Sequence, residues 1–152
     1  MTPKRLPVTK KALEENAGAA WNAFIELVAT TSYEDLTPAQ RPAHLVFWYE
    51  SEVQNGGHLQ YFTNRGDERG DETIQSLRAL GADAQARVLG QALASWRSAV
   101  RPVPADADEY VAIALGGEFD DLDKAFHECP IQLIDALKRY FAHHESDFIA
   151  RQ

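Results

Sequence analysis

Between Tyr49 and Gly66 the chain reads YESEVQNGGHLQYFTNRG, and no other segment places aromatic, amide and glycine residues so close together. Asn55, Gly56 and Gly57 suit the end of a helix, because Asn and Gly tolerate the left-handed backbone conformation that closes a C-terminus. A helix that stops there can turn sharply. The stretch therefore determines how the segments before and after it can pack.

A second, shorter helix is expected directly after this turn. Residues 58–65 are long enough for about two helical turns, and Asn64 with Gly66 would end them in the same manner. A β-hairpin is the alternative, because Asn-Gly between alternating residues is typical of hairpins. Glu52 lies in the last turn before the stop, where the helix dipole disfavours an anion, so we expect a local donor such as a following backbone N–H to hold it.

The same stretch resembles the signature of the DNA mimic protein nineteen family. The resemblance implies an all-helical fold in which the motif residues have a structural role. It also implies a protein that, like the family's founding member, presents carboxylates as a dimer to a helix-turn-helix transcription factor and keeps that factor off DNA. The residues that carry the resemblance are Tyr49, Glu52, Asn55, Gly56, Gly57, Gln60, Tyr61, Phe62 and Asn64.

Apolar residues recur at helical spacing through the rest of the chain. The first stripe begins after a cap at Thr9 and is expected to form one helix that ends near Thr30, and Pro130 is expected to start the last helix. Residues 1–8 are interpreted as a loose N-terminal arm. The sequence predicts an all-α fold: a single compact domain over residues 1–152 with about seven or eight helices and no convincing strand. Between these ends, helix starts are expected at Pro42, at Asp67 or Asp71, and at Asp83, Asp106 and Asp120.

Composition excludes several classes of protein. At 152 residues with 45% hydrophobic content, the chain is long enough for one core and too apolar for a disordered protein. Its start lacks the apolar run of a secretory signal, and no segment approaches the roughly 18 apolar residues of a membrane span. We therefore expect a cytoplasmic protein that does not bind membranes.

The net charge is acidic. Twenty-three acidic residues against fifteen basic residues give a formal charge of −8. This charge opposes direct binding to nucleic acid or to anionic membranes, and it permits a partner with a basic face.

No metal site or cofactor is predicted. His143 and His144 are adjacent, so their side chains point about 100° apart on a helix and make a poor pair of ligands. Neither the helical zinc and di-iron patterns nor a P-loop, nucleophile elbow or dinucleotide fingerprint occurs. Cys129 is the only cysteine, which excludes an internal disulfide. We interpret it as a buried thiol rather than a nucleophile.

His58 leaves one catalytic alternative open. Together with Glu52, Gln60, Tyr61 and Asn64 it could line a small polar pocket beside the turn, as in a small hydrolase. The same residues could instead form a hydrogen-bonded network that fixes the turn, which buried polar groups require in any case. No residue is assigned a catalytic role.

The densest acidic region runs from residue 106 to residue 123. Part of its charge is explained by helix capping, because carboxylates are favoured at helix N-termini. We nevertheless expect this region to be the partner-binding surface. Its seven carboxylates belong to Asp106, Asp108, Glu109, Glu118, Asp120, Asp121 and Asp123.

Molecular size limits how far such a surface could copy DNA. A compact chain of this length is roughly 40 Å across, and a duplex of that length carries about 23 phosphates. The 23 carboxylate side chains of this chain cover all of its faces, so mimicry requires clustering on one side or a homodimer. The function hypothesis is a non-catalytic protein that binds a DNA-binding protein and competes with DNA. An immunity-type inhibitor or another protein-interaction module is the alternative.

Overall fold

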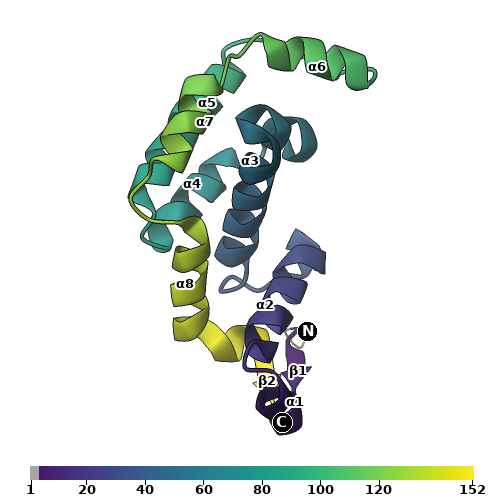
Figure 1. Ribbon diagram of the computed structural model, residues 1–152, viewed down its shortest axis with the longest axis vertical. Helices are drawn as coiled ribbons and strands as arrows, with labels where there is room; N and C mark the ends of the chain where they lie inside the picture. The colour runs from purple at the N-terminus through teal and green to yellow at the C-terminus, as the bar shows by residue number, and fades with distance from the viewer. Residues whose placement is uncertain (1–3) are drawn as a thin grey trace.

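The computed structural model describes residues 4–152 and is almost entirely helical (Figure 1). Eight α-helices, a 3-10 turn and two short strands occur within the described residues, which confirms the all-α prediction. In chain order the elements are β1 (Leu6–Val8), α1 (Lys10–Glu15), α2 (Ala19–Thr30), η1 (Tyr33–Asp35), α3 (Arg41–Arg65), α4 (Gly70–Ala79), α5 (Asp83–Arg97), α6 (Ala107–Leu115), α7 (Asp120–His127), α8 (Leu133–Phe148) and β2 (Ile149–Arg151).

Helix α3 is the central element, and it is sharply kinked. Gly57 has φ 75° and ψ −173°, which breaks the helix into a segment before the kink and a short segment after it. Gly66 ends the second segment with φ 70°. The predicted pair of helices joined by a sharp turn is therefore confirmed, and the hairpin alternative is wrong.

The other helices pack around α3. Helices α4 and α7 contact it, and α5 packs against both of them, while α2 and α8 pack against α3 and against each other. The buried apolar residues of these elements form one connected core. Its largest members include Phe24, Tyr49, Phe62 and Phe148, each less than 2% exposed.

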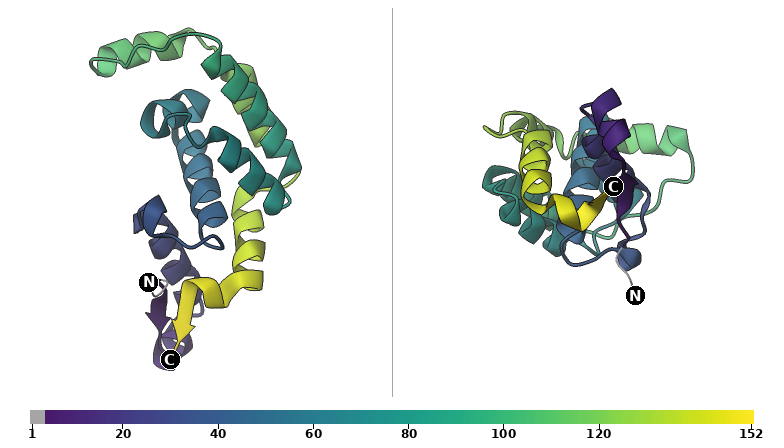
Figure 2. Two further views of the ribbon diagram at one scale, coloured as in Figure 1. Left: turned by 180° about the vertical axis from the view of Figure 1, so that it is seen from behind. Right: turned by 90° about the horizontal axis from the view of Figure 1, so that it is seen from below.

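The N-terminal region differs from the expected loose arm. Leu6–Val8 form strand β1, which pairs in parallel with β2 at the C-terminal end, as both views of Figure 2 allow the reader to follow. The pairing is stabilised by burial of Val8 and Ile149, and Gln40 Nε2 donates to the carbonyls of Lys4 and Asp147 at 2.7 and 2.8 Å. Residues 1–3 of the predicted arm lie outside the described residues.

Several helix boundaries also differ from the prediction. The expected first helix is divided at Asn16, whose side chain accepts a hydrogen bond from the Gly18 N–H at 2.8 Å and so stabilises a local turn. Helix α4 begins without a side-chain cap, because Asp67 and Asp71 bind Arg97 instead. The last helix begins at Leu133 rather than at Pro130.

Helix α6 projects from the body of the molecule (Figure 1). It lies across the end of α3 and connects α5 to α7, and none of its residues is buried. The preceding linker and the helix expose Val100, Val103, Val111, Ile113 and Leu115. Within residues 4–152, no helix has the length and apolar character to cross a membrane.

Candidate functional site

The acidic segment, residues 106–123, comprises α6, the turn at Gly116 and Gly117, and the start of α7. Asp106 and Glu109 stabilise the start of α6. The Glu109 N–H donates to Asp106 Oδ1 at 2.9 Å, and the Glu109 carboxylate accepts in return from the Ala105 N–H. The first contact confirms the predicted cap at Asp106, and the second is a variant of the capping box in which Glu109 binds the N–H of the residue before the cap. Both residues remain exposed.

Glu118 forms a salt bridge with a neighbouring arginine, Arg101. Its carboxylate accepts from Arg101 Nη2 at 2.6 Å and from Ser95 Oγ at 2.7 Å. These hydrogen bonds, that of Arg101 foremost, hold the pKa of Glu118 below its ordinary value. Glu118 therefore connects the linker before α6 to the end of α5, and its charge is partly compensated within the fold.

The Asp123 side chain is 29% exposed and forms the outer end of a hydrogen-bonded network that runs into the core. Its Oδ1 accepts from the His58 backbone N–H at 2.8 Å and lies 2.7 Å from His58 Nδ1. The His58 ring has no exposed surface, and its Nε2 lies 2.7 Å from the Tyr49 hydroxyl. Because a carboxylate only accepts, Nδ1 is the donor, and in the neutral ring Nε2 then accepts from Tyr49. Burial raises the pKa of Tyr49 well above its ordinary value, which keeps its hydroxyl available as the donor.

The kink of α3 is shaped to admit this contact. A Cβ atom at Gly57 would lie 2.3 Å from Asp123 Oδ2, so only glycine lets α7 approach so closely. Gly56 is similarly crowded by Gln60, whose Oε1 accepts from Asn55 Nδ2 at 3.1 Å. The amide and glycine residues of the kink therefore fix the backbone and one another.

Glu52 finds a different donor from the one predicted. Asn64 Nδ2, from the segment after the kink, donates to Glu52 Oε2 at 2.7 Å, whereas a following backbone N–H was expected. Side-chain bonding therefore holds the two segments of α3 together. Tyr61 and Phe62 complete the core side of this contact: Tyr61 meets Tyr49 edge to face, and Phe62 stacks on Trp96.

Three carboxylates of the acidic segment have neither a hydrogen-bond partner nor an ionic partner among the described residues. They belong to Asp108, Asp120 and Asp121, and all three side chains are exposed. Asp120 was expected to cap α7, but its side chain makes no cap hydrogen bond and Phe119 occupies the cap position. These three carboxylates are therefore the ones that the described part of the fold leaves unbonded and open to a partner.

Part of the acidic segment meets the kink of α3. Glu118, Asp120 and Asp123 line a small hollow, and Gly56 forms part of its wall. The volume of this hollow is about 110 Å³, which is below the roughly 300 Å³ at which small-molecule pockets begin. The pKa of Tyr110 in α6 is raised mainly by burial and, to a smaller extent, by the nearby carboxylates of Glu52 and Asp123. The structure thus connects the acidic segment to the motif, a connection that sequence spacing does not reveal.

The alternative of a catalytic pocket at His58 has little geometric support. Both ring nitrogens of His58 are hydrogen-bonded inside the fold, and the ring is fully buried. Among the described residues, no group of three or more His, Cys, Asp or Glu side chains is arranged to hold a metal ion. The buried chain from Tyr49 to Asp123 is suited to fixing the kink and the position of α7.

Comparison with known proteins gives one result. The family model described as DMP19-like protein matches residues 34–150, which span the kinked helix, the acidic segment and the last helix. No curated protein and no solved structure matches the chain significantly.

Proposed function

The chain belongs to the DMP19-like protein family, and from this premise we propose that it is a non-catalytic protein that binds a DNA-binding protein by presenting carboxylates in place of DNA phosphates. A helix-turn-helix transcription factor is the type of partner proposed, which makes the protein a regulator of transcription. The observation that carries the proposal is the set of exposed, unpaired carboxylates at Asp108, Asp120 and Asp121.

The geometry supports two different roles for the carboxylates of the acidic segment. Asp106 and Glu109 stabilise the start of α6, and Glu118 and Asp123 attach the segment to α5 and α3. Internal bonding thus positions the segment, while the three unpaired carboxylates extend into solvent. An acidic surface on a chain of charge −8 would steer a basic partner electrostatically, and salt would weaken the complex.

The test is a pull-down from native lysate with the full chain as bait, at low and at high salt. We expect recovery of a DNA-binding protein that is lost at high salt and displaced by duplex DNA. Substituting Asp108→Asn, Asp120→Asn and Asp121→Asn together should abolish recovery. Asp123 must be left intact, because its loss would disturb the fold rather than the surface alone.

A matched control separates this surface from net charge. The triple substitution Glu14→Gln, Glu26→Gln and Asp35→Asn removes the same charge from exposed positions outside the acidic segment, and it should leave recovery unchanged. Equal loss in both triple variants, or a complex that high salt does not weaken, would contradict the proposal.

A second candidate function is an interaction module whose contacts are mainly apolar. Leu115 and Val111 of α6 are 83% and 52% exposed, although apolar side chains of this size are usually covered in a monomer. They could serve an inhibitor-like complex or a homodimer. A salt-resistant complex that is lost in Val111→Ser and Leu115→Ser, but retained in the acidic triple variant, would favour this function.

A further inference from the structure

A separate pocket lies between the end of α2, the η1 turn, α3 and the start of α4. Its volume is about 450 Å³, which lies within the range of roughly 300–1,000 Å³ typical of small-molecule sites. It shares no residue with the acidic segment. Tyr33, Trp48 and Tyr61 contribute aromatic surface to its wall.

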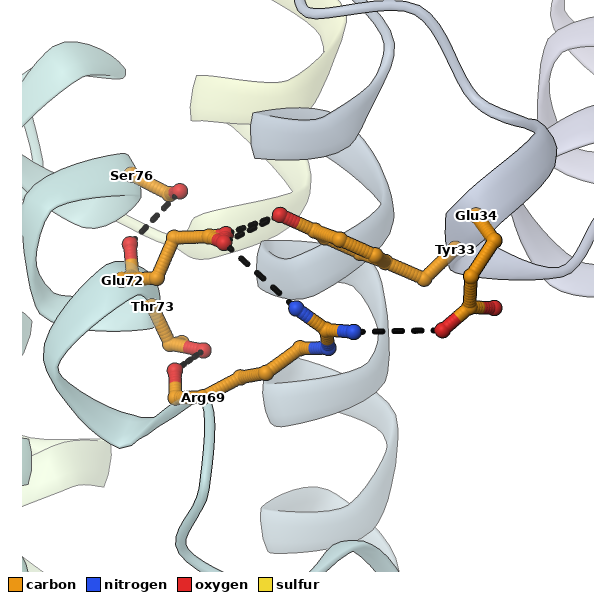
Figure 3. Close-up of polar contacts among 6 residues, drawn as sticks. All are labelled: Tyr33, Glu34, Arg69, Glu72, Thr73 and Ser76. Carbon is orange, nitrogen blue, oxygen red and sulfur yellow. Dashed lines mark hydrogen bonds and ion pairs between the residues drawn. The ribbon is translucent and has the colours of Figure 1, made fainter.

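One wall is held in place before any ligand binds (Figure 3). The Tyr33 hydroxyl donates to the Glu72 carboxylate, and the Arg69 guanidinium lies 3.4 Å from the centre of the Tyr33 ring. Arg69 also pairs with Glu34 at 3.2 Å and lies 3.9 Å from Glu72. The Tyr33 wall is therefore preformed, and the charge of Arg69 is already neutralised by carboxylates of the fold.

Arg65 differs from Arg69 in this respect. Its guanidinium lies 3.5 Å from the centre of the Trp48 ring, but no carboxylate of the described residues forms a salt bridge with it. A guanidinium that stacks on an aromatic ring keeps its N–H groups available in a planar fork, which matches a carboxylate. Arg65 is thus positioned to receive an anionic group at the pocket.

His44 provides a neutral acceptor rather than a second cation. Its Nδ1 lies 2.7 Å from the Val28 carbonyl, which only accepts, so Nδ1 is the donor and Nε2 has a free lone pair. Burial, with a smaller effect from Arg65 and Arg69, lowers the pKa of His44 and keeps the ring neutral near pH 7.

Thr31 in the same wall has an unsatisfied hydroxyl. The residue is only 5% exposed, and its Oγ1 has no hydrogen-bond partner among the described residues. Buried hydroxyl groups without a partner are rare in folded proteins. The pocket wall thus includes two hydrogen-bonding groups, at Thr31 and His44, that the described residues do not use.

These features define the class of ligand. Of the two arginines that line the pocket only Arg65 is unpaired, which favours a single negative charge, and the Glu34 and Glu68 side chains in the wall would repel a polyanion. Aromatic walls favour a flat apolar body. We propose that this pocket binds a small planar monocarboxylate, with the ligand's carboxylate on Arg65 and its ring against the aromatic wall.

The proposal can be tested with benzoate as the probe. In a ¹H–¹⁵N spectrum of the full chain, benzoate should shift the Trp48 indole N–H and the Arg65 Nε–H in a saturable manner. Benzamide, which has the same shape without the charge, and inorganic phosphate should not. Arg65→Gln should weaken benzoate binding at least about tenfold, the usual effect of losing about 1.4 kcal/mol from a charge-assisted contact.

Arg78→Gln is the matched control, because Arg78 is exposed on α4 outside this pocket and the substitution removes the same charge. It should leave benzoate binding unchanged. Shifts that do not saturate, equal binding of benzamide, or equal weakening in both arginine variants would overturn the proposal. None of these outcomes depends on the acidic segment, so a failure here leaves the proposed function untouched.

Discussion

Gly57 and Gly66 adopt nearly the same backbone conformation but have different surroundings. Their φ and ψ values are 75° and −173° for Gly57, and 70° and −170° for Gly66. This region is essentially restricted to glycine and costs other residues about 1–3 kcal/mol. At Gly57 a Cβ would also collide with Asp123, whereas at Gly66 no atom lies within 4 Å of it. Comparing substitutions at the two positions therefore separates the cost of backbone strain from the cost of a steric clash.

The Gly57→Ala variant is expected to lose substantially more stability than Gly66→Ala. Both should lose about 1–3 kcal/mol from backbone strain. The additional loss in Gly57→Ala comes from displacing Asp123, which leaves the buried His58 N–H and Nδ1 without their acceptor, at about 1–3 kcal/mol. Urea unfolding followed by circular dichroism measures both free energies. Equal losses in the two variants would mean that the contact between the kink and α7 contributes nothing.

At the level of elements, α6 is held by its ends rather than by its side chains. None of its residues is buried, although its sequence has the apolar spacing of a packed helix. The capping box at Asp106 and the contact of Glu118 with Arg101 hold the two ends. A helix with few buried contacts should open locally without unfolding the rest of the protein.

A proline substitution tests this independence. Proline inside a helix costs about 3 kcal/mol or more. In Ala112→Pro that cost should stay within α6: helicity falls slightly, and the free energy of global unfolding changes by less than about 0.5 kcal/mol. The control is Ala92→Pro in α5, where Ala92 is fully buried and the loss should be global. Thermal unfolding and amide exchange of both variants distinguish the outcomes, and a global loss in Ala112→Pro would show that α6 packs on the body.

Local sequence signals explain which elements were predictable. The stop at Gly57, the end at Gly66 and the cap at Asp106 depend on residues close in sequence, so the pattern predicted them. The exposure of Ile113 and Leu115 was not predictable, because helical spacing shows that a face is apolar but not whether another element covers it. The break at Asn16 was missed because the apolar stripe continues across it.

Longer-range contacts limited the prediction of the candidate site. Asp123 could be placed at the start of a helix, but its contact with His58 joins residues 65 positions apart. The pairing of β1 with β2 likewise joins the two ends of the described chain, for which three-residue strands give almost no local signal. The acidic surface was therefore predicted as seven equivalent carboxylates, and only three-dimensional contacts separate the structural members from the unpaired ones.

At the level of the whole molecule, the tyrosines share one electrostatic property. The chain has five, at positions 33, 49, 61, 110 and 140, and burial is the main cause that raises the pKa of each above its ordinary value. The folded state therefore keeps its phenol protons at a pH where the unfolded chain releases them. Stability is complete below the unfolded pKa of about 10 and falls as pH rises beyond it.

Alkaline unfolding should consequently be coupled to phenolate formation. Each tyrosine with a raised pKa contributes a slope of up to about 1.4 kcal/mol per pH unit above pH 10, so absorbance at ~295 nm, where phenolate absorbs, and circular dichroism should change together. Tyr49→Phe removes the most deeply buried phenol, so the free energy of unfolding should fall less steeply as pH rises. At neutral pH the variant should lose about 1 kcal/mol, because the hydrogen bond to His58 is absent. A phenolate titration with its midpoint near pH 10, while the helical signal stayed intact, would show that the tyrosines are accessible in the folded molecule and that their burial does not stabilise it.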